Sequence, residues 1–199
     1  MNFESNSEFI DKTFSDLDFS GGRLEESEFE ACSFMGCNFS DAALVRCLFA
    51  DCTFQRCNFN LTRFDRSKLR EAEFKDCKLT GVNWTSLDWS SFNLTAPMFF
   101  ESCDLSFSVF NNLELQELGM QDCKSHDVDF SECDLRGSDF FRTDFLDARF
   151  ALTRLNNCNF LEAMNYAIDP VENDIAGARF STPEVLNLLS SFRINIDED

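Results

Sequence analysis

Residues 132–150, ECDLRGSDFFRTDFLDARF, carry a large apolar residue at every fifth position, namely Leu135, Phe140, Phe145 and Phe150. In an α-helix, residues five apart are rotated by roughly 140°, so this set would scatter around the cylinder. In a strand, side chains alternate with a period of two, so an odd period would place successive Phe on opposite faces. A period of five keeps one inward direction only if the chain turns a corner in every repeat. The stretch therefore predicts a solenoid of short straight segments.

The same spacing runs through most of the 199 residues. From Phe9 to Leu94, every fifth residue is Phe, Leu or Trp. The frame then slips by one residue and resumes from Phe100 to Phe160, with Ser125 as the polar exception. We expect these central residues, called position i, to form the core of the solenoid. The core column is expected to include Phe34, Phe39, Phe54, Phe59, Phe130, Leu135, Phe140, Phe145, Phe150 and Phe160.

All ten cysteines lie at position i−2, two residues before the central residue of a repeat. Residues i−2 and i share one side of an extended segment, so each repeat should direct one small and one large residue inward. A buried free thiol behaves as a small apolar side chain. Disulfides and zinc are the alternatives, but zinc sites usually show closer Cys pairs and often His, and His126 is the single histidine. No metal or cofactor is therefore expected. The small inward positions are Cys32, Cys37, Cys47, Cys52, Cys57, Cys77, Cys103, Cys123, Cys133 and Cys158.

Asn or Asp recurs at position i−1, immediately before the central residue. These side chains can hydrogen-bond the nearby backbone at tight turns, so part of the acidity should serve the structure. Examples are Asn38, Asn58, Asn83, Asn93, Asp104, Asp134, Asp139, Asp144 and Asn159.

The repeated units resemble the pattern A/C-D/N-F/L-x-x of the pentapeptide-repeat family. The resemblance is carried by CNFSD (37–41), CNFNL (57–61), CDLRG (133–137) and CNFLE (158–162), and one more unit lies near 178–180. It implies an all-β fold, a right-handed quadrilateral β-helix with four pentapeptides in each coil. About eight coils stacked at ~4.8 Å would give a rod roughly 40 Å long and about as wide as a DNA duplex.

Further stretches resemble the albicidin-resistance branch of this family, which is related to the quinolone-resistance proteins. They are GVNWTS (81–86), NYAID (165–169), NDIAGARFSTPEVLNLL (173–189) and the acidic end NIDED (195–199). The resemblance implies a homodimer that mimics DNA and acts on bacterial DNA gyrase. Quinolone-resistance proteins commonly carry long loops thrown out of the coil. Here the sequence shows only the one-residue slip near 95–100, which places the chain nearer to the loop-poor members.

Three regions are expected along the chain: an N-terminal cap (1–6), a β-helix (7–165) and a C-terminal segment (166–199). Near the slip, Pro97 lacks an N–H group and cannot donate to a strand ladder, so a bulge or kink is expected. The bulge could match the shape of a partner or be a tolerated insertion.

The C-terminal segment predicts a short α-helix at about 183–192. Thr182 could be its N-cap with Pro183 in the first turn, or Ser181 and Glu184 could form a capping box. The apolar stripe should cover the last coil, form a two-fold interface, or both, and the resemblance favours a homodimer. The residues assigned to the dimer interface are Val185, Leu186, Leu188, Leu189, Phe192, Ile194 and Ile196.

Charge is abundant and uneven. The chain has 36 acidic and 17 basic residues, a net charge of −19, which argues against binding to nucleic acid or anionic membranes. Residues 1–45 carry −8, residues 46–100 carry +2 and residues 101–199 carry −13. Joining two chains at their C-terminal ends would form a densely negative rod that suits a basic groove. The acidic face expected to bind a partner comprises Asp129, Asp134, Asp139, Asp144 and Asp147.

Two functions are consistent with these features. One is a non-enzymatic DNA mimic that binds DNA gyrase or topoisomerase IV, modulates supercoiling and protects the enzyme from albicidin or a fluoroquinolone. The other is an interaction scaffold with an unrelated protein partner, in which the acidic surface provides only solubility. An enzyme is not expected, because adjacency of Ser125 and His126 does not make a catalytic dyad.

A cytoplasmic location is expected for the protein. The first twelve residues, MNFESNSEFIDK, lack the basic and apolar regions of a secretory signal. No apolar run approaches the ~18 residues that a membrane span requires.

Overall fold

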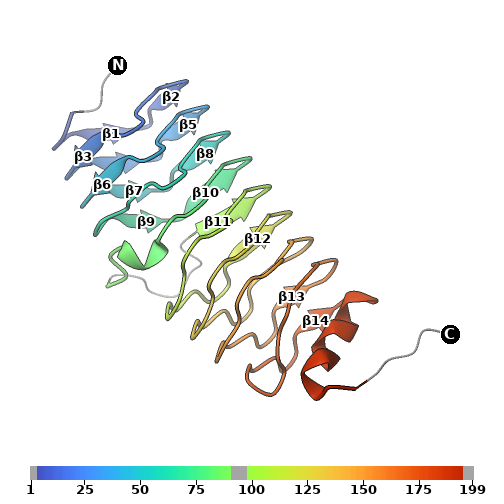
Figure 1. Ribbon diagram of the computed structural model, residues 1–199. Coiled ribbons are helices and arrows are strands. Elements are labelled where there is room, and N and C mark those ends of the chain that lie inside the picture. The colour runs from blue at the N-terminus through green and yellow to red at the C-terminus, as the bar shows by residue number, and fades with distance from the viewer. Residues whose placement is uncertain (1–3, 91–97, 195–199) are drawn as a thin grey trace.

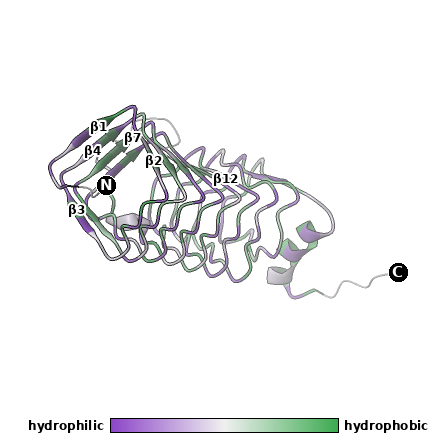
Figure 2. Cartoon of the chain, turned by 90° about the horizontal axis from the view of Figure 1, so that it is seen from above, coloured by the Kyte–Doolittle hydropathy of each residue, from purple (hydrophilic) through white to green (hydrophobic). Residues whose placement is uncertain are grey.

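The protein is a rod of stacked coils in a computed structural model that describes residues 4–90 and 98–194 (Figure 1). It is a right-handed quadrilateral β-helix of about eight turns, as the sequence predicts. The first coil lies at one end of the rod and a short helix covers the other end (Figure 1). Viewed from above in Figure 2, each coil is a roughly square loop, and successive coils superimpose along the rod.

Each coil has four sides, numbered here in chain order from the side that contains Phe9. Parallel strands are in register on three of these sides. Side one contains β1 (Glu8–Ile10), β4 (Glu28–Glu30), β7 (Leu48–Ala50) and β9 (Lys68–Arg70). Side two contains β2 (Thr13–Ser15), β5 (Ser33–Met35), β8 (Thr53–Gln55), β10 (Ala72–Lys75), β11 (Met98–Glu101), β12 (Gly119–Gln121), β13 (Asn159–Phe160) and β14 (Arg179–Phe180). Side four contains β3 (Arg23–Glu25) and β6 (Ala43–Val45).

Side three and the later coils are held by isolated parallel bridges instead of longer strands. Asp18, Asn38 and Asn58 are bridged in this way, each twenty residues from the next. Twenty residues is the length of four pentapeptides, so equivalent residues of neighbouring coils lie one above the other.

The corners depend on a left-handed backbone conformation at position i+2. Asp11 has a φ of 51° and Asp16 a φ of 52°, and the same region is occupied at nearly every described corner. At a typical corner, the N–H of Asp16 donates to the carbonyl oxygen of Met35 in the next coil, at 2.8 Å. Asp, Asn and Gly tolerate this conformation best, which accounts for their frequency at i+2.

One coil is longer than the others. Phe54 pairs with Phe74 at the usual spacing of twenty residues, but Phe74 pairs with Phe100, twenty-six residues further on. This coil therefore contains six extra residues, one whole pentapeptide more than the single extra residue that the frame slip suggests. Six inserted residues equal one complete pentapeptide plus one residue. The extra pentapeptide keeps the five-residue period, so the sequence reveals only the shift by one residue. Leu94 and Pro97, on which the sequence prediction rested, lie outside the described residues.

A single turn of 3-10 helix, Trp84–Ser86, lies within the long coil. The Asn83 side chain accepts a hydrogen bond from the N–H of Thr85 and caps this turn. The sequence did not predict it.

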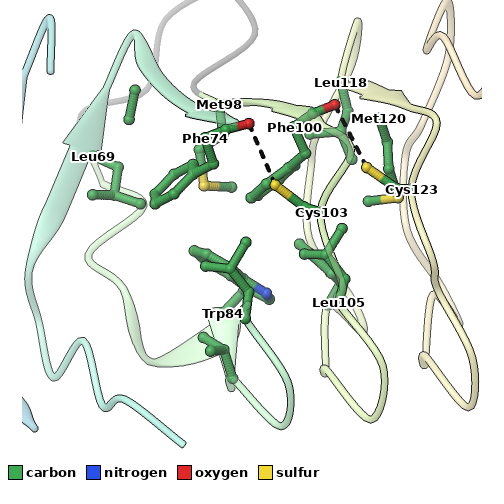
Figure 3. Packing of buried hydrophobic residues seen from close by; sticks show 14 of the residues in the cluster. Leu69, Phe74, Trp84, Met98, Phe100, Cys103, Leu105, Leu118, Met120 and Cys123 are labelled. Atoms are coloured by element: carbon green, nitrogen blue, oxygen red, sulfur yellow. Dashed lines mark hydrogen bonds between the residues drawn. The ribbon is translucent and has the colours of Figure 1, made fainter. Parts of the chain in front are cut away.

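The core is a set of aromatic stacks that follow the rod axis. On side two, Phe34 and Phe54 stack with ring centroids 4.8 Å apart and an interplanar angle of 15°. Neighbouring columns meet edge to face, as in Phe54 and Phe59 at 5.3 Å and 85°, an arrangement that aromatic rings favour. Figure 3 shows Phe74, Trp84 and Phe100 packed together in this core. All ten residues assigned to the core column from the sequence are buried.

The ten cysteines are free thiols and all are buried. Their Sγ atoms donate to backbone carbonyls of the neighbouring coil, for example Cys103 to the Phe74 oxygen at 3.4 Å (Figure 3). Ser67 and Thr62 occupy the equivalent position in other repeats and donate in the same way. In these repeats, position i−2 therefore holds a small side chain that donates one hydrogen bond inward.

The C-terminal helix spans Glu184–Phe192 and is a 3-10 helix, so the predicted type, an α-helix, was wrong. The predicted caps were also wrong. Pro183 is the residue before the helix and follows a cis peptide bond, and no side chain caps the first turn. The Ser181 Oγ instead accepts from the Glu162 N–H, and the Glu184 carboxylate accepts from the Asn165 N–H. Contacts with the last coil thus replace the local capping pattern.

The helix covers the last coil with one face. Leu188 is buried and Val185 packs against the core. Below them, Phe160 and Phe180 stack on each other with ring centroids 5.1 Å apart, and the Tyr166 ring is tilted against both, with ring centroids 5.8 and 5.5 Å away. Three of the residues assigned to the dimer interface remain exposed, namely Leu186, Phe192 and Ile194. Ile196, which was assigned to the same interface, lies outside the described residues.

Candidate interaction surface

The acidic residues at position i−1 bind the backbone of their own repeat. The N–H of residue i+1 donates to the side chain at i−1, as in Ser131 to Asp129 at 2.9 Å and Ser106 to Asp104 at 3.1 Å. Asn38 and Asn58 make the same bond. One side-chain oxygen is thereby used in the turn.

The five aspartates predicted to form one acidic face are not brought together. Asp129, Asp134, Asp139 and Asp144 belong to consecutive pentapeptides, so the chain turns a corner between each pair. Each is bridged to its own partner twenty residues later, in four separate ladders. The carboxylates therefore lie one on each side of the coil, and Asp147 lies at the corner between sides three and four.

Asp134 is almost enclosed, with 8% of its side chain exposed. Arg136 contacts its Oδ2 atom at 2.7 Å, and Arg154 contacts the same atom at 3.4 Å. The Gln116 amide also donates to it, at 2.9 Å. Burial alone would raise the pKa of Asp134, but the hydrogen bonds from Arg136 and Gln116 lower this pKa to about 2. This charge is neutralised within the rod and is a poor contact for a basic partner.

Asp139 and Asp144 also have partners in the surface. Asp139 accepts from the amides of Gln121 and Asn159. Asp144 Oδ2 lies 2.8 Å from His126 Nε2, and the Asn165 amide donates to its Oδ1 at 2.7 Å. Burial would raise the pKa of Asp144, but the bonds from Asn165 and His126 lower it.

Asp147 is the most accessible of the five predicted aspartates. It is exposed at its corner, and Asp127 occupies the same corner one coil below, also exposed. Neither takes part in the ion pairs of residues 4–90 and 98–194. The sequence prediction missed Asp127, although comparison of residues twenty apart, instead of five, would have paired it with Asp147.

Serine 125 is fully buried in the core column of side three, where its Oγ donates to the Met120 sulfur at 3.1 Å. His126 points outward to Asp144, so the two neighbouring side chains do not face one another. In the parts of the chain that the structure describes, no three His, Cys, Asp or Glu side chains are grouped as metal ligands would be. No described helix is long and apolar enough to cross a membrane.

Comparison with known proteins agrees with the repeat. A family model described as "Pentapeptide repeat region" matches residues 27–97, and one described as "Pentapeptide repeats (8 copies)" matches residues 126–160. The fold and the repeat define a solenoid built from five-residue units. The chain belongs to the pentapeptide-repeat family. A search among curated protein sequences gave no match.

Several solved structures share the fold. Full-length QnrB1, a plasmid-mediated fluoroquinolone resistance protein, is 20% identical, with 94% of this chain and 90% of that chain covered and a TM-score of 0.58. A trypsin-treated form of QnrB1 is 19% identical, with 98% of each chain covered and a TM-score of 0.66. HetL, a protein involved in heterocyst differentiation regulation in the cyanobacterium Nostoc, is 15% identical, with 89% and 86% covered and a TM-score of 0.69. At these identities the likeness establishes the fold alone.

Proposed function

We propose that this chain is a non-enzymatic DNA mimic that binds bacterial DNA gyrase or topoisomerase IV and modulates supercoiling. The observation that carries the proposal is the distribution of acid around a quadrilateral rod of stacked coils. Aspartates at i−1 occur on all four sides of the coil, although Asp134 is neutralised by arginine, and a duplex likewise carries phosphate around its whole circumference. The net charge of −13 beyond residue 100 increases the resemblance to a negatively charged duplex. Similarity of fold over nearly the whole chain to a fluoroquinolone resistance protein also supports the proposal.

The proposal includes a cytoplasmic homodimer joined at the C-terminal helix. Leu186, Phe192 and Ile194 are 44%, 51% and 55% exposed, an apolar area that association would bury. Joining two rods here would bring their two acidic halves together at the centre.

A gyrase supercoiling assay tests the function. The protein is titrated against gyrase with and without albicidin or ciprofloxacin, at low and high salt. We expect inhibition at micromolar protein or below that is relieved by salt, because charged contacts between exposed groups are screened. Relief of the drug effect would identify a protective role. No effect on gyrase or topoisomerase IV in either arm would exclude the proposal.

A scaffold for another protein partner is the second candidate function. The observation in its favour is the band of Lys and Arg between residues 46 and 100, which interrupts the acidic rod. Arg70 pairs with Asp51 and Lys68 with Asp88 within this band, so it is locally balanced and does not resemble a phosphate backbone. Displacement of gyrase-bound DNA by the protein would favour mimicry over this alternative.

A further inference from the structure

Two bulky apolar residues lie at one corner of the rod where the backbone favours Gly or Asp. The corner between sides three and four is occupied, in successive coils, by Gly21, Asp41, Leu61, Gly81, Phe107, Asp127 and Asp147, all with positive φ. Leu61 and Phe107, at φ of 57° and 62°, are the two of these residues for which this conformation is unfavourable.

These two side chains are also exposed, Leu61 by 57% and Phe107 by 60%. They flank Gly81 in adjacent coils, because the Leu61 N–H donates to Thr80 and the Gly81 N–H donates to Ser106. A Cβ at Gly81 would lie 2.7 Å from Leu61 Cδ2, so the Leu61 side chain lies across the bare glycine. Leu61, Gly81 and Phe107 thus follow one another along this corner with no acidic residue between them, and they are called here the corner ridge.

The stability of the fold does not account for the corner ridge. A large side chain at positive φ costs free energy relative to Gly or Asn, and an exposed one contributes little burial in return. Residues that are unfavourable locally and unused in the core are candidates for function.

The charges around the ridge indicate what covers it. Asp41 lies beyond one end, and Asp127 and Asp147 lie beyond the other. Two copies packed antiparallel about Gly81 would place Leu61 against Phe107 but also Asp41 against Asp127, and the like charges would repel. A nucleic acid or an anionic membrane would meet the same carboxylates at both ends of the ridge, and they oppose its approach although Arg63 lies beside Leu61. The remaining occupant is a basic protein surface.

We propose that the corner ridge is an apolar anchor for a protein partner that offers a cleft about 10 Å long, two coil spacings, with Lys or Arg at its ends. An apolar centre with a charged rim is the usual anatomy of a binding hot spot. The inference rests on the proposed function, and the partner is therefore the topoisomerase. The ridge would make an apolar contact that the phosphate backbone of DNA cannot make, so binding would not depend on charge alone.

Binding of immobilised gyrase and of topoisomerase IV, measured at two salt concentrations, tests the ridge. The variants are Phe107→Asn and the double variant Leu61→Asn with Phe107→Asn, because Asn tolerates positive φ. The matched control is Leu152→Asn, which is 65% exposed with φ of 55° at a different corner. We expect the double variant to bind at least about tenfold more weakly than the unaltered chain at both salt concentrations. Leu152→Asn should bind as the unaltered chain does.

Thermal unfolding of the same variants separates anchoring from stability. The ridge variants should melt no lower than the unaltered protein. A clear loss of thermal stability would assign the ridge to the fold and overturn the inference. Equal binding of the ridge variants and the unaltered chain would refute the ridge while leaving the proposed function intact. Failure of the unaltered chain to bind either enzyme would refute both the ridge and the proposed function.

Discussion

Asp134 illustrates how a surface carboxylate becomes part of the structure. It accepts one bond from its own turn and others from Arg136, Arg154 and Gln116. The sequence predicted the turn bond, because Asp at a tight corner has few other local partners. It could not predict the arginine contacts, since Arg154 reaches Asp134 only through the stacking of coils twenty residues apart.

Replacement of Asp134 by Asn should destabilise the protein in a pH-dependent way. The folded pKa of about 2 is below the ordinary value near 3.8, so the carboxylate stabilises the fold above the unfolded pKa. That contribution, about 2 kcal/mol, is lost as the pH falls through the range from about 4 to 2. Urea unfolding of both proteins at pH 7, 4 and 2.5 should show a difference that shrinks with acid.

The control for this experiment is Asp147→Asn, which alters an exposed corner carboxylate outside the ion pairs of the described residues. It should change the free energy of unfolding by less than about 0.5 kcal/mol at each pH. A difference for Asp134→Asn that stays constant down to pH 2.5 would show that the arginine contacts are not the cause.

The inward thiols should be replaceable by hydroxyls. Cys77 Sγ donates to the Phe54 carbonyl at 3.3 Å, and Ser67 makes the equivalent bond to Leu44 at 2.9 Å. We therefore expect Cys77→Ser to lower the free energy of unfolding by no more than about 1 kcal/mol, since the hydrogen bond is kept. Cys77→Leu, which overfills the site, should cost about 1–3 kcal/mol. Denaturant melts under reducing conditions would compare them, and equal losses would contradict this account.

At the scale of the element, the unit of the fold is the coil of four pentapeptides. The sequence shows the five-residue repeat clearly, but it does not show where each twenty-residue coil begins. The five-residue period predicted which residues point inward but not which repeats share a side. For that reason five consecutive aspartates were grouped as one face. The C-terminal helix was located correctly, but its type was not, because contacts of Ser181 and Glu184 with the last coil override the local capping signals.

Removal of six residues should leave a regular coil. Deleting residues 92–97 would place Phe100 five positions after Trp89. Ser91 would then be at position i+2 of its repeat, a position at which Ser102 has a positive φ in another repeat. We expect the shortened chain to keep its circular dichroism spectrum and to melt at the same temperature or higher, because a shorter loop loses less entropy on closure. Deleting five residues, 93–97, is the control and should disturb the register. Unfolding of the six-residue deletion would contradict the register between Phe74 and Phe100.

At the scale of the whole molecule, the rod itself was predictable because its cause is repeated in every coil. The period of five, the small residue at i−2 and the large residue at i all require the same corner-turning path, and the stacked aromatic rings follow from it. The surface was less predictable, since twenty-residue ladders decide which charges meet and which are neutralised.

The proposed homodimer can be tested at the C-terminal end of the rod. Light scattering after size exclusion should give about 46 kDa for the unaltered protein, twice the chain mass of 22.9 kDa. Replacing Leu186 and Ile194 together by Asp should yield the 22.9 kDa monomer, because buried unpaired charges oppose association. Leu152→Asn should remain dimeric. A monomeric unaltered protein would remove the homodimer from the proposed function.

The buried thiol columns also affect how the chain withstands oxidants. Burial raises the pKa of Cys52, Cys133 and Cys158 to about 12 each, so little reactive thiolate forms while the coils stay closed. Once the rod opens, ten thiols become available to form mismatched cross-links that no native coil can accommodate. Recovery of the fold after unfolding should therefore depend on a reductant, and the protein's chemical lifetime would be set by how rarely its coils separate.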